Sequence, residues 1–249
     1  MTWLHCYQPR PAARLRLVCF PHAGGAATFF RGWANLVPPE IELLAVQYPG
    51  RGDRLADPPF DDMYRLVSAL AESLSGRLDA PYAFFGHSMG AAVAHETVAH
   101  LLREGHPGPV RFFASGREAP HHHHGGDLHL RGDDALAGEL IRLGGTPPEL
   151  LADVEMRSLL LPTLRADYRL IETYRPSGAA LGCPVTAMIG QADPDVPIAE
   201  AADWAAVTHG GFDLRTFTGD HFYLVPHRQA VVGTLVHHLG MAPAWPSTP

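Results

Sequence analysis

Short apolar runs alternate with amphipathic stretches along most of this chain. The runs are bounded by Gly- or Pro-containing segments, and we predict strands at Leu15–Phe20, Ile41–Tyr48, Tyr82–Phe85, Val110–Ala114, Val185–Ile189 and Phe212–Phe217. Between the runs, helical spacing of apolar residues predicts helices over Met63–Leu78, Met89–Leu102, Pro197–Ala206 and Arg228–Leu239. This alternation indicates βαβ units, so we predict an α/β fold with a mainly parallel sheet flanked by helices.

One segment departs from this alternation. Residues 127–174 show helical periodicity and no strand, in two groups of leucines separated by Gly144–Pro148. A helical insertion between two strands predicts a lid over a substrate pocket. The alternative is an ordinary helical crossover, for which this segment is long. No repeat or linker interrupts the chain, so we predict a single domain over residues 1–249.

Composition and charge narrow the class of protein. The chain has 249 residues, of which 46% are hydrophobic and 18% charged, which excludes disorder, collagen-like sequence and coiled coil. A net charge of −7 argues against a nucleic-acid binder. No apolar run approaches the roughly 18 residues of a membrane helix, and the N-terminus does not resemble a signal peptide. Three cysteines suggest a reducing compartment, so we predict a cytoplasmic protein.

The central chemical signal is the segment Gly86-His87-Ser88-Met89-Gly90. It follows a predicted strand and opens a predicted helix. In that context Gly-x-Ser-x-Gly predicts a nucleophile elbow, where glycines permit a strained turn that exposes the serine hydroxyl. The alternative, a glycine-rich turn that happens to carry a serine, does not account for the strand and helix on either side. We therefore predict Ser88 as a catalytic nucleophile.

A serine nucleophile needs a base and an acid, which should follow in the order Ser, Asp, His. Asp193 lies just past the predicted strand Val185–Ile189, and we prefer it to its neighbour Asp195 because it is nearer the strand end. Among sixteen histidines, His221 follows the predicted strand Phe212–Phe217 and precedes the last helix. Its loop should share the carboxyl edge of the sheet with Ser88 and Asp193.

The oxyanion of the reaction needs two backbone N–H donors. One should be Met89, the residue after the nucleophile, and the other should come from the loop after the first predicted strand. That loop contains His22-Ala23-Gly24-Gly25, in which we choose Ala23. His22 and His87 flank the site and are expected to support it rather than to act as bases.

The run His121–His124 is a possible metal site. No Asp, Glu or Cys at a suitable spacing completes a ligand set in the sequence, so we expect a solvated loop instead.

Five segments carry the pattern of a known family: Phe20–Gly25, Tyr48–Arg54, Gly86–Ala91, Ser115–Pro120 and Leu164–Asp167. Over almost its full length the chain resembles the stand-alone type II thioesterases of polyketide and non-ribosomal peptide assembly lines, in the α/β-hydrolase superfamily. The histidine run after Pro120 departs from that pattern. The resemblance implies a Ser88–His221–Asp193 triad, an oxyanion hole at Ala23 and Met89, and a lid over residues 127–174.

The resemblance also implies a reaction and a partner. Such enzymes hydrolyse acyl thioesters on the 4′-phosphopantetheine arm of acyl or peptidyl carrier proteins, through an acyl-serine intermediate. The enzyme should need no metal or cofactor, bind no nucleic acid or membrane, and act as a monomer. Carrier proteins are usually acidic, so we expect a local basic patch for which Arg117, Arg131 and Arg142 are candidates.

Three other functions remain open at this stage. The same triad would serve a carboxylesterase or lipase that acts on oxygen esters, or a release thioesterase that cyclises its product. A hydrolase-fold binding protein without activity is the third, and the complete set of triad candidates argues against it.

Overall fold

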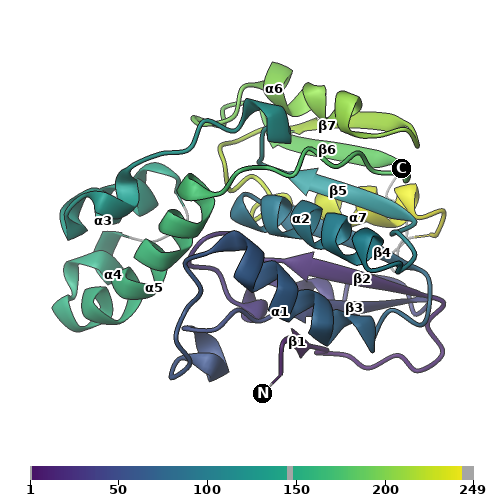
Figure 1. Cartoon of the computed structure of the whole chain (residues 1–249), viewed down its shortest axis with the longest axis horizontal. Coiled ribbons are helices and arrows are strands. Elements are labelled where there is room, and N and C mark those ends of the chain that lie inside the picture. Colours follow the sequence, from purple (N-terminus) through teal and green to yellow (C-terminus); the bar gives the residue numbers. More distant parts are fainter. Residues whose placement is uncertain (1, 145–147, 243–249) are drawn as a thin grey trace.

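A computed structural model describes residues 2–144 and 148–242 of the chain (Figure 1). Its centre is a seven-stranded sheet in the order β1-β3-β2-β4-β5-β6-β7, in which only the β1–β3 pair is antiparallel. The strands are β1 (Leu4–His5), β2 (Leu15–Phe20), β3 (Ile41–Val46), β4 (Tyr82–His87), β5 (Arg111–Ser115), β6 (Val185–Gly190) and β7 (Phe212–Phe217). The predicted α/β architecture with a mainly parallel sheet is confirmed.

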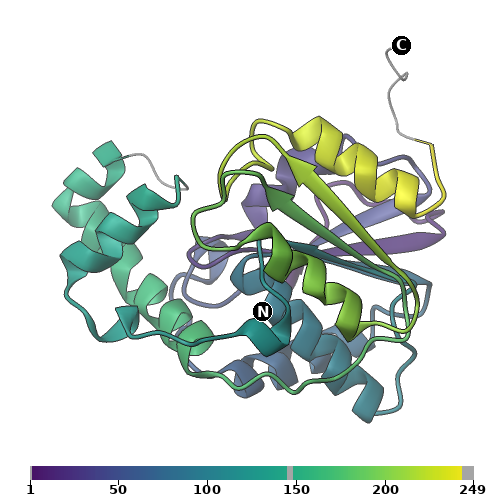
Figure 2. The ribbon, with the colours of Figure 1, turned by 90° about the horizontal axis from the view of Figure 1, so that it is seen from above.

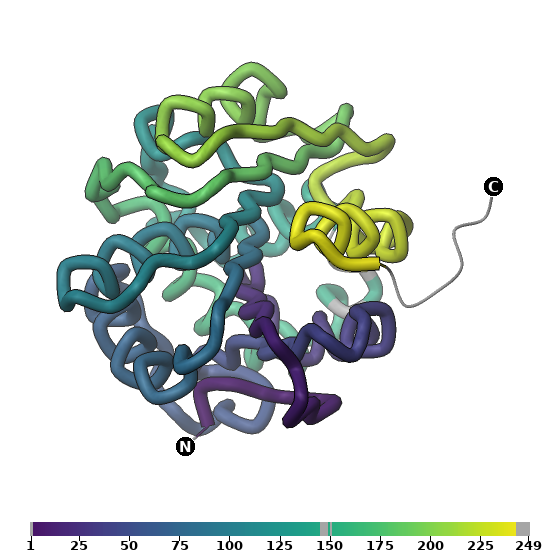
Figure 3. Tube along the Cα trace, turned by 90° about the vertical axis from the view of Figure 1, so that its right-hand side faces the viewer, coloured from purple at the N-terminus to yellow at the C-terminus, as the bar shows by residue number. Residues whose placement is uncertain are grey.

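Helices cover both faces of this sheet. Figure 2 shows α7 on one face and α1, α2 and α6 on the other. Seen from the side in Figure 3, the twisted sheet runs between the two helical layers. The helices of these layers are α1 (Met63–Ser75), α2 (Met89–Arg103), α6 (Ile198–Ala202) and α7 (Arg228–His238). Five short 3₁₀ segments accompany them: η1 (Ala27–Trp33), η2 (Gly52–Arg54), η3 (Pro120–His122), η4 (Leu128–Leu130) and η5 (Asp203–Val207).

Each face of the sheet carries its own apolar core. Leu66 and Leu70 of α1 pack with Val93 of α2 on one side. On the other side Trp33 of η1 packs with Val232 of α7. Strand residues alternate between the two cores, because successive side chains of a strand point to opposite faces. Burial on both faces explains why the central strands are continuously apolar in the sequence.

Local signals start the helices where the structure has them. The Asp62 side chain caps α1 by accepting a hydrogen bond from the Arg65 backbone N–H at 2.9 Å. Within α1 the buried positions Met63, Leu66, Val67 and Leu70 follow helical spacing. A cap and an apolar stripe together fix both the start of a helix and the face that it buries.

Residues 127–174 are called the insertion below, and its described residues, 127–144 and 148–174, form a helical layer beyond the sheet. The arrowheads of β2 and β5 in Figure 1 point towards its helices. These are α3 (Asp133–Arg142), α4 (Pro148–Ala152) and α5 (Val154–Thr173). Asp153 caps α5 by accepting from two backbone N–H groups at 2.9 Å, and Pro162 lies inside the helix. The described part of the insertion has no strand, as predicted; the predicted separator Gly144–Pro148 lies partly outside the described residues.

A few element boundaries differ from the sequence-based prediction. The two-residue strand β1 was not predicted, because two residues at a sheet edge show no periodicity. β3 ends at Val46, two residues before Tyr48, and the predicted helix over Pro197–Ala206 is divided between α6 and η5. Among the residues that the structure describes, no helix combines the length and the apolar character needed to span a bilayer.

Candidate active site

Ser88 occupies the sharp turn between β4 and α2. Its φ is 55°, and within the described residues it is the only non-glycine residue with a positive φ. Such a backbone is strained for any residue with a Cβ. The Ser88 backbone N–H donates to the Ser115 carbonyl oxygen of β5 at 2.8 Å, which fixes the turn to the neighbouring strand. This is the strand–turn–helix geometry of a nucleophile elbow.

The glycines on either side of Ser88 are required by close backbone packing. A Cβ on Gly86 would lie 2.4 Å from the Cα of Ala91, and one on Gly90 would lie 2.2 Å from the Phe20 carbonyl oxygen. Helix α2 therefore approaches β4 and β2 more closely than any residue with a side chain would allow. This approach places the N-terminus of α2, with its partial positive charge, directly behind Ser88.

His221 and Asp193 meet at the same edge of the sheet. His221 Nδ1 and Asp193 Oδ2 are 2.8 Å apart, and both side chains are almost fully buried. A carboxylate only accepts, so Nδ1 carries the proton of a neutral ring and Nε2 keeps its lone pair. The other carboxylate oxygen of Asp193 accepts from the Asp195 and Val196 backbone N–H groups at 3.0 and 3.2 Å. The ring is thus held in the tautomer that a general base needs.

The competing carboxylate points away from the histidine. Asp195 lies 2.6 Å from the guanidinium of Arg142, on α3 of the insertion. The structure therefore brings His221 together with Asp193 and not with its neighbour, the choice made from the sequence.

His221 lies beside the residue that precedes the candidate nucleophile. The ring centroids of His221 and His87 are 5.0 Å apart. Within the described part of the chain the Ser88 hydroxyl makes no hydrogen bond to the His221 ring. Catalytic hydrogen bonds often tighten only when substrate is bound, so this spacing is compatible with a serine–histidine pair.

Two further histidines next to the site are held neutral. Burial lowers the pKa of His87 well below its ordinary value, and the nearby rings of His221 and His22 lower it further. Burial likewise lowers the pKa of His22 to about 3. His87 Nδ1 contacts the Ser115 hydroxyl at 2.9 Å, which in turn contacts the Tyr223 hydroxyl at 2.7 Å. Neither ring adds charge beside His221 near neutral pH, in keeping with a supporting role.

The two backbone N–H groups predicted as oxyanion donors lie in the loop after β2 and at the start of α2. In the loop after β2, the Gly25 N–H donates to the His22 carbonyl oxygen at 2.9 Å and the Gly24 N–H to Asp167 Oδ2 at 2.7 Å. Within the described residues the N–H of Ala23 has no acceptor, and neither does that of Met89 at the start of α2. The assignment of these two N–H groups as the oxyanion donors stays a prediction.

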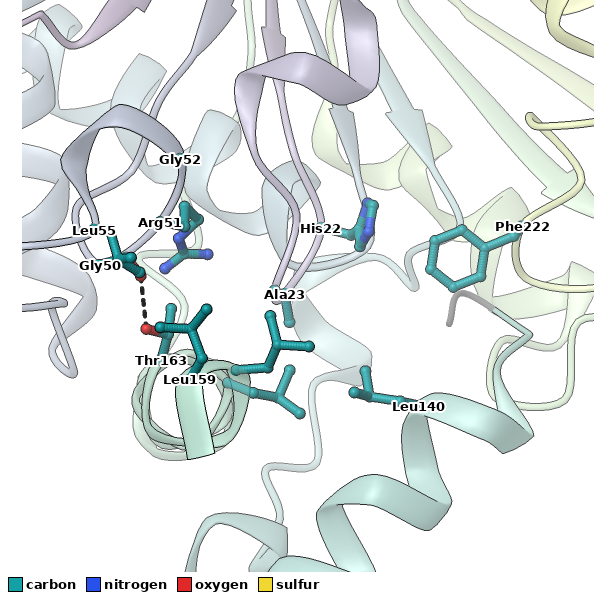
Figure 4. A pocket seen from close by; sticks show the side chains of 13 residues that line it. His22, Ala23, Gly50, Arg51, Gly52, Leu55, Leu140, Leu159, Thr163 and Phe222 are labelled. Carbon is teal, nitrogen blue, oxygen red and sulfur yellow. Dashed lines mark hydrogen bonds between the residues drawn. The ribbon is translucent and has the colours of Figure 1, made fainter. Parts of the chain in front are cut away.

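An apolar pocket opens beside this loop, with a volume of about 300 Å³. That volume is at the lower end of the range for small-molecule sites. One wall carries His22, Ala23 and Phe222, the last directly after His221; the insertion contributes Leu140, Leu159, Leu160 and Leu164. Figure 4 shows Leu140 and Leu159 on the insertion side, across from Ala23. An apolar chain in this pocket would end near the candidate oxyanion donor.

Comparison with known proteins identifies the family. The family model described as "Thioesterase domain" matches residues 15–239. The chain belongs to the thioesterase family.

The relatives agree with this assignment. The chain is 42% identical over 246 residues to "Probable cadicidin biosynthesis thioesterase" of Streptomyces griseus, covering 97% of this chain and 68% of the relative. It is 41% identical over 245 residues to "Thioesterase PikA5" of Streptomyces venezuelae, covering 95% and 85% of the two chains. The solved type II thioesterase BorB from the borrelidin biosynthetic cluster is 42% identical with a TM-score of 0.86, covering 95% of this chain and 97% of that one. The resemblance to type II thioesterases, the α/β-hydrolase fold and the assignment as a thioesterase enzyme are confirmed.

The three arginines expected to form a basic patch on this thioesterase are all paired with acids. Arg131 contacts Asp127 at 2.7 Å, Arg117 contacts Glu118 at 2.8 Å, and Arg142 contacts both Glu139 and Asp195 at 2.6 Å. Arg117 is also largely buried. These arginines therefore contribute little net positive charge to the surface.

Two residues of the run His121–His124 make side-chain contacts, in contrast to the solvated loop expected from the sequence. His123 Nδ1 lies 2.9 Å from the Arg117 guanidinium, and its ring lies against Tyr174 with the ring centroids 4.4 Å apart and the planes tilted by 41°. His122 Nε2 lies 2.6 Å from Asp203 Oδ2. His121, His122 and Asp203 bring three potential ligand atoms within 4.8 Å of one another. Ligands of a tetrahedral zinc ion are about 3.3 Å apart, because each lies roughly 2.0–2.1 Å from the metal. The His122–Asp203 pair is therefore a hydrogen bond that leaves no room for an ion between its atoms.

Two of the motifs that carry the family resemblance, Tyr48–Arg54 and Leu164–Asp167, contain side chains to which the sequence assigned no role. Arg51, in the motif after β3, and Asp167, in α5, form a buried ion pair. A separation of 116 positions in the sequence gives no local signal for this contact.

Proposed function

We propose that this thioesterase hydrolyses acyl groups from the phosphopantetheine arm of acyl or peptidyl carrier proteins. The observation that carries the proposal is the 2.8 Å contact between His221 and Asp193, beside a strained serine and an apolar pocket. The names of the relatives add that thioesterases of this family serve biosynthetic clusters such as that of borrelidin. We further propose one domain over residues 1–249, with the insertion as its lid.

In the first half of the reaction, Ser88 becomes acylated. His221 Nε2 takes the hydroxyl proton while Ser88 Oγ attacks the thioester carbonyl carbon. The N–H groups of Ala23 and Met89 stabilise the oxyanion of the tetrahedral intermediate, and the buried carboxylate of Asp193 stabilises the imidazolium. The intermediate expels the pantetheine sulfur, and the proton held by His221 returns to it. A thiol with a pKa of about 8.5 leaves readily, so this proton transfer matters less than for an alcohol.

In the second half, water releases the acid. His221 takes a proton from water, whose oxygen attacks the acyl-Ser88 carbonyl carbon, and the same two N–H groups stabilise the oxyanion. Collapse of the intermediate returns the proton to Ser88 Oγ and frees the carboxylic acid.

The pocket supports an acyl rather than a polar substrate. Most of its apolar side chains are leucines of the insertion and Phe222, and Ala23 also lines it. Polar side chains come from His22, Arg51 and Thr163. Burial of apolar surface provides roughly 25 cal/mol per Å² of favourable free energy, so the acyl chain supplies the binding energy that positions the thioester. The carrier protein remains outside, with only the pantetheine arm reaching the serine.

The test is a panel of carrier proteins loaded with acyl groups of increasing length, with mass-spectrometric detection of the free acid. We expect hydrolysis by the wild type and a loss of roughly 10⁴-fold or more in Ser88→Ala. Ser75→Ala is the matched control, because Ser75 lies exposed at the end of α1 and its hydroxyl contacts only the Glu72 carbonyl oxygen.

Three outcomes would count against the proposal. Retention of the hydrolytic rate in Ser88→Ala would exclude an acyl-serine mechanism. A preference for p-nitrophenyl oxygen esters over acyl-pantetheines of equal chain length would indicate a carboxylesterase. Release of lactone in place of free acid would indicate a cyclising thioesterase.

A further inference from the structure

A buried ion pair joins three segments that are far apart in the sequence. Arg51 Nη1 and Nη2 donate to Asp167 Oδ2 and Oδ1 at 2.6 and 2.7 Å. Only 8% of the Arg51 side chain and 3% of the Asp167 side chain are exposed. Arg51 lies in the loop after β3 and Asp167 on α5 of the insertion. The third segment is the loop after β2, whose Gly24 N–H donates to the same carboxylate at 2.7 Å.

The Arg51–Asp167 ion pair helps to hold the loop after β2, which carries the Ala23 N–H, the candidate oxyanion donor. The His22 carbonyl and the Ala23 N–H belong to one planar peptide unit. The bond from the Gly25 N–H to the His22 carbonyl oxygen therefore sets the plane in which the Ala23 N–H lies. The next peptide unit contains the Gly24 N–H, which Asp167 holds. Gly24 has a φ of +74°, so without this bond its backbone would be free to adopt many alternatives.

The charges of Arg51 and Asp167 are better explained by a role in positioning the Gly24 N–H than by a role in packing α5. A buried ion pair is often no more stable than apolar residues of similar volume, because both charges lose their hydration. An apolar side chain already lies next to Gly24, since Leu164 Cδ1 would lie 3.3 Å from a Cβ on Gly24. An apolar pair would hold α5 in place, but it would provide no acceptor for the Gly24 N–H. A charged acceptor makes a shorter and stronger hydrogen bond than a neutral one.

We propose that Asp167, held in place by Arg51, is a positioning residue that sets the Ala23 N–H for the oxyanion and couples that donor to the seating of α5. The inference rests on the proposed function, since it presumes an oxyanion at Ala23. It assigns a role to the two family motifs, around Arg51 and Asp167, that the triad leaves unexplained.

The test compares two variants for their effects on the transition state and on the ground state. Asp167→Asn keeps the shape of the side chain but removes its charge. Arg51→Met/Asp167→Leu removes both charges together, so no unpaired charge remains buried and the fold is retained. For each we would measure kcat and KM on an acyl-carrier substrate, and inhibition by an alkylboronic acid, which forms a tetrahedral anionic adduct with an active-site serine.

We expect kcat to fall roughly 10- to 100-fold in both variants, because misplacing a catalytic group by about 1 Å costs up to about 100-fold. The inhibition constant of the boronic acid should rise in parallel in both variants. KM should change by less than about threefold in Asp167→Asn, because Asp167 does not line the pocket, whereas Arg51 does. Arg165→Ala is the matched control: Arg165 ties α5 to the carbonyl oxygens of His129 and Arg131 and does not contact the loop after β2. It should leave the boronic acid affinity unchanged.

Each other outcome overturns the inference. If the folded double variant keeps wild-type kcat and boronic acid affinity, the ion pair does not position the oxyanion donor. If kcat falls while boronic acid affinity is retained, the pair acts only through the structure of the insertion. A wild type that boronic acids do not inhibit, or that tolerates Ser88→Ala, would show instead that the proposed function has failed.

Discussion

At the catalytic edge of the sheet a Cβ on Gly90 would lie 2.2 Å from backbone, whereas in helix α3 of the insertion a Cβ on Gly138 would meet nothing within 4 Å. The same contrast appears among the apolar side chains. Those around Ser88 are buried, while Val154 and Leu159 of α5 are 79% and 45% exposed. The candidate catalytic residues are thus held by close backbone packing, whereas part of the pocket wall, such as Leu159, is exposed. We expect these two regions to differ in their tolerance to substitution.

The largest effect on kcat should come from a substitution of Asp193, at the edge of the sheet that carries Ser88 and His221. We expect Asp193→Asn to reduce kcat by about 10⁴-fold, because the amide would hold His221 in the wrong tautomer. The measurement is single-turnover hydrolysis of an acyl-carrier substrate. Asp195→Asn is the control, since Asp195 contacts Arg142 and not His221. Equal losses in the two variants would contradict the assignment of Asp193.

Substitutions of Gly90, beside Ser88, and Gly138, in helix α3 of the insertion, compare the two regions most directly. Gly90→Ala should destabilise the fold by roughly 3 kcal/mol or more, since its methyl group would overlap the Phe20 carbonyl oxygen. Gly138→Ala should stabilise the fold by roughly 0.5–1 kcal/mol, because alanine is the better helix former and nothing stands in its way. Urea unfolding of both variants checks the pair. Changes of the same sign would show that the two regions do not differ in this way.

Within the insertion, a larger side chain should change specificity more than stability. Leu159→Trp would narrow the pocket and is expected to disfavour long acyl groups relative to short ones by about 1–3 kcal/mol in kcat/KM. The measurement is the ratio of kcat/KM for two acyl lengths. Leu130→Trp is the control, because Leu130 is 77% exposed and does not line the pocket. An unchanged ratio in Leu159→Trp would exclude this pocket as the acyl site.

The smallest expected effect is a change in how the free energy of unfolding depends on pH. The pKa of His87 in the folded protein lies well below its ordinary value, chiefly through burial, so below about pH 6.5 the unfolded chain binds a proton that the folded protein does not. The free energy of unfolding should therefore fall as the pH drops below 6.5. In His87→Asn this decrease should be smaller by up to about 1.4 kcal/mol per pH unit. Urea unfolding at several pH values checks it, with the exposed His237→Asn as control; identical slopes in wild type and His87→Asn would contradict the assignment.

Most of the sheet and the local geometry of the site could be predicted from the sequence, because both depend on short-range signals. A short apolar run such as Leu15–Phe20, followed by a Pro- and Gly-containing loop, favours a buried strand, and the glycines around Ser88 indicate the elbow that the structure contains. The contact of His221 with Asp193 followed from a rule of the fold: parallel strands present their carboxyl ends at one edge.

Other contacts could not be predicted because they depend on how distant segments pack. Nothing in the sequence places Asp167 against Arg51, or Asp203 against His122, and an exposed loop was the expectation for the latter histidine. The arginines predicted as a basic patch likewise proved to be paired with acids that only the folded chain brings near, as Arg142 is with Asp195.

Pro162 lies inside α5, between Leu159 and Leu160 of the pocket wall and the buried Asp167. Proline has no N–H to donate, so the hydrogen bond to the carbonyl four residues earlier is missing, and the helix is easiest to bend there. Leu159 and Leu160 of the pocket wall precede Pro162, whereas Leu164 of the same wall and Asp167 follow it. A tilt of the first half of α5 at Pro162 would therefore move Leu159 and Leu160 while leaving the Asp167 carboxylate beside the Gly24 N–H.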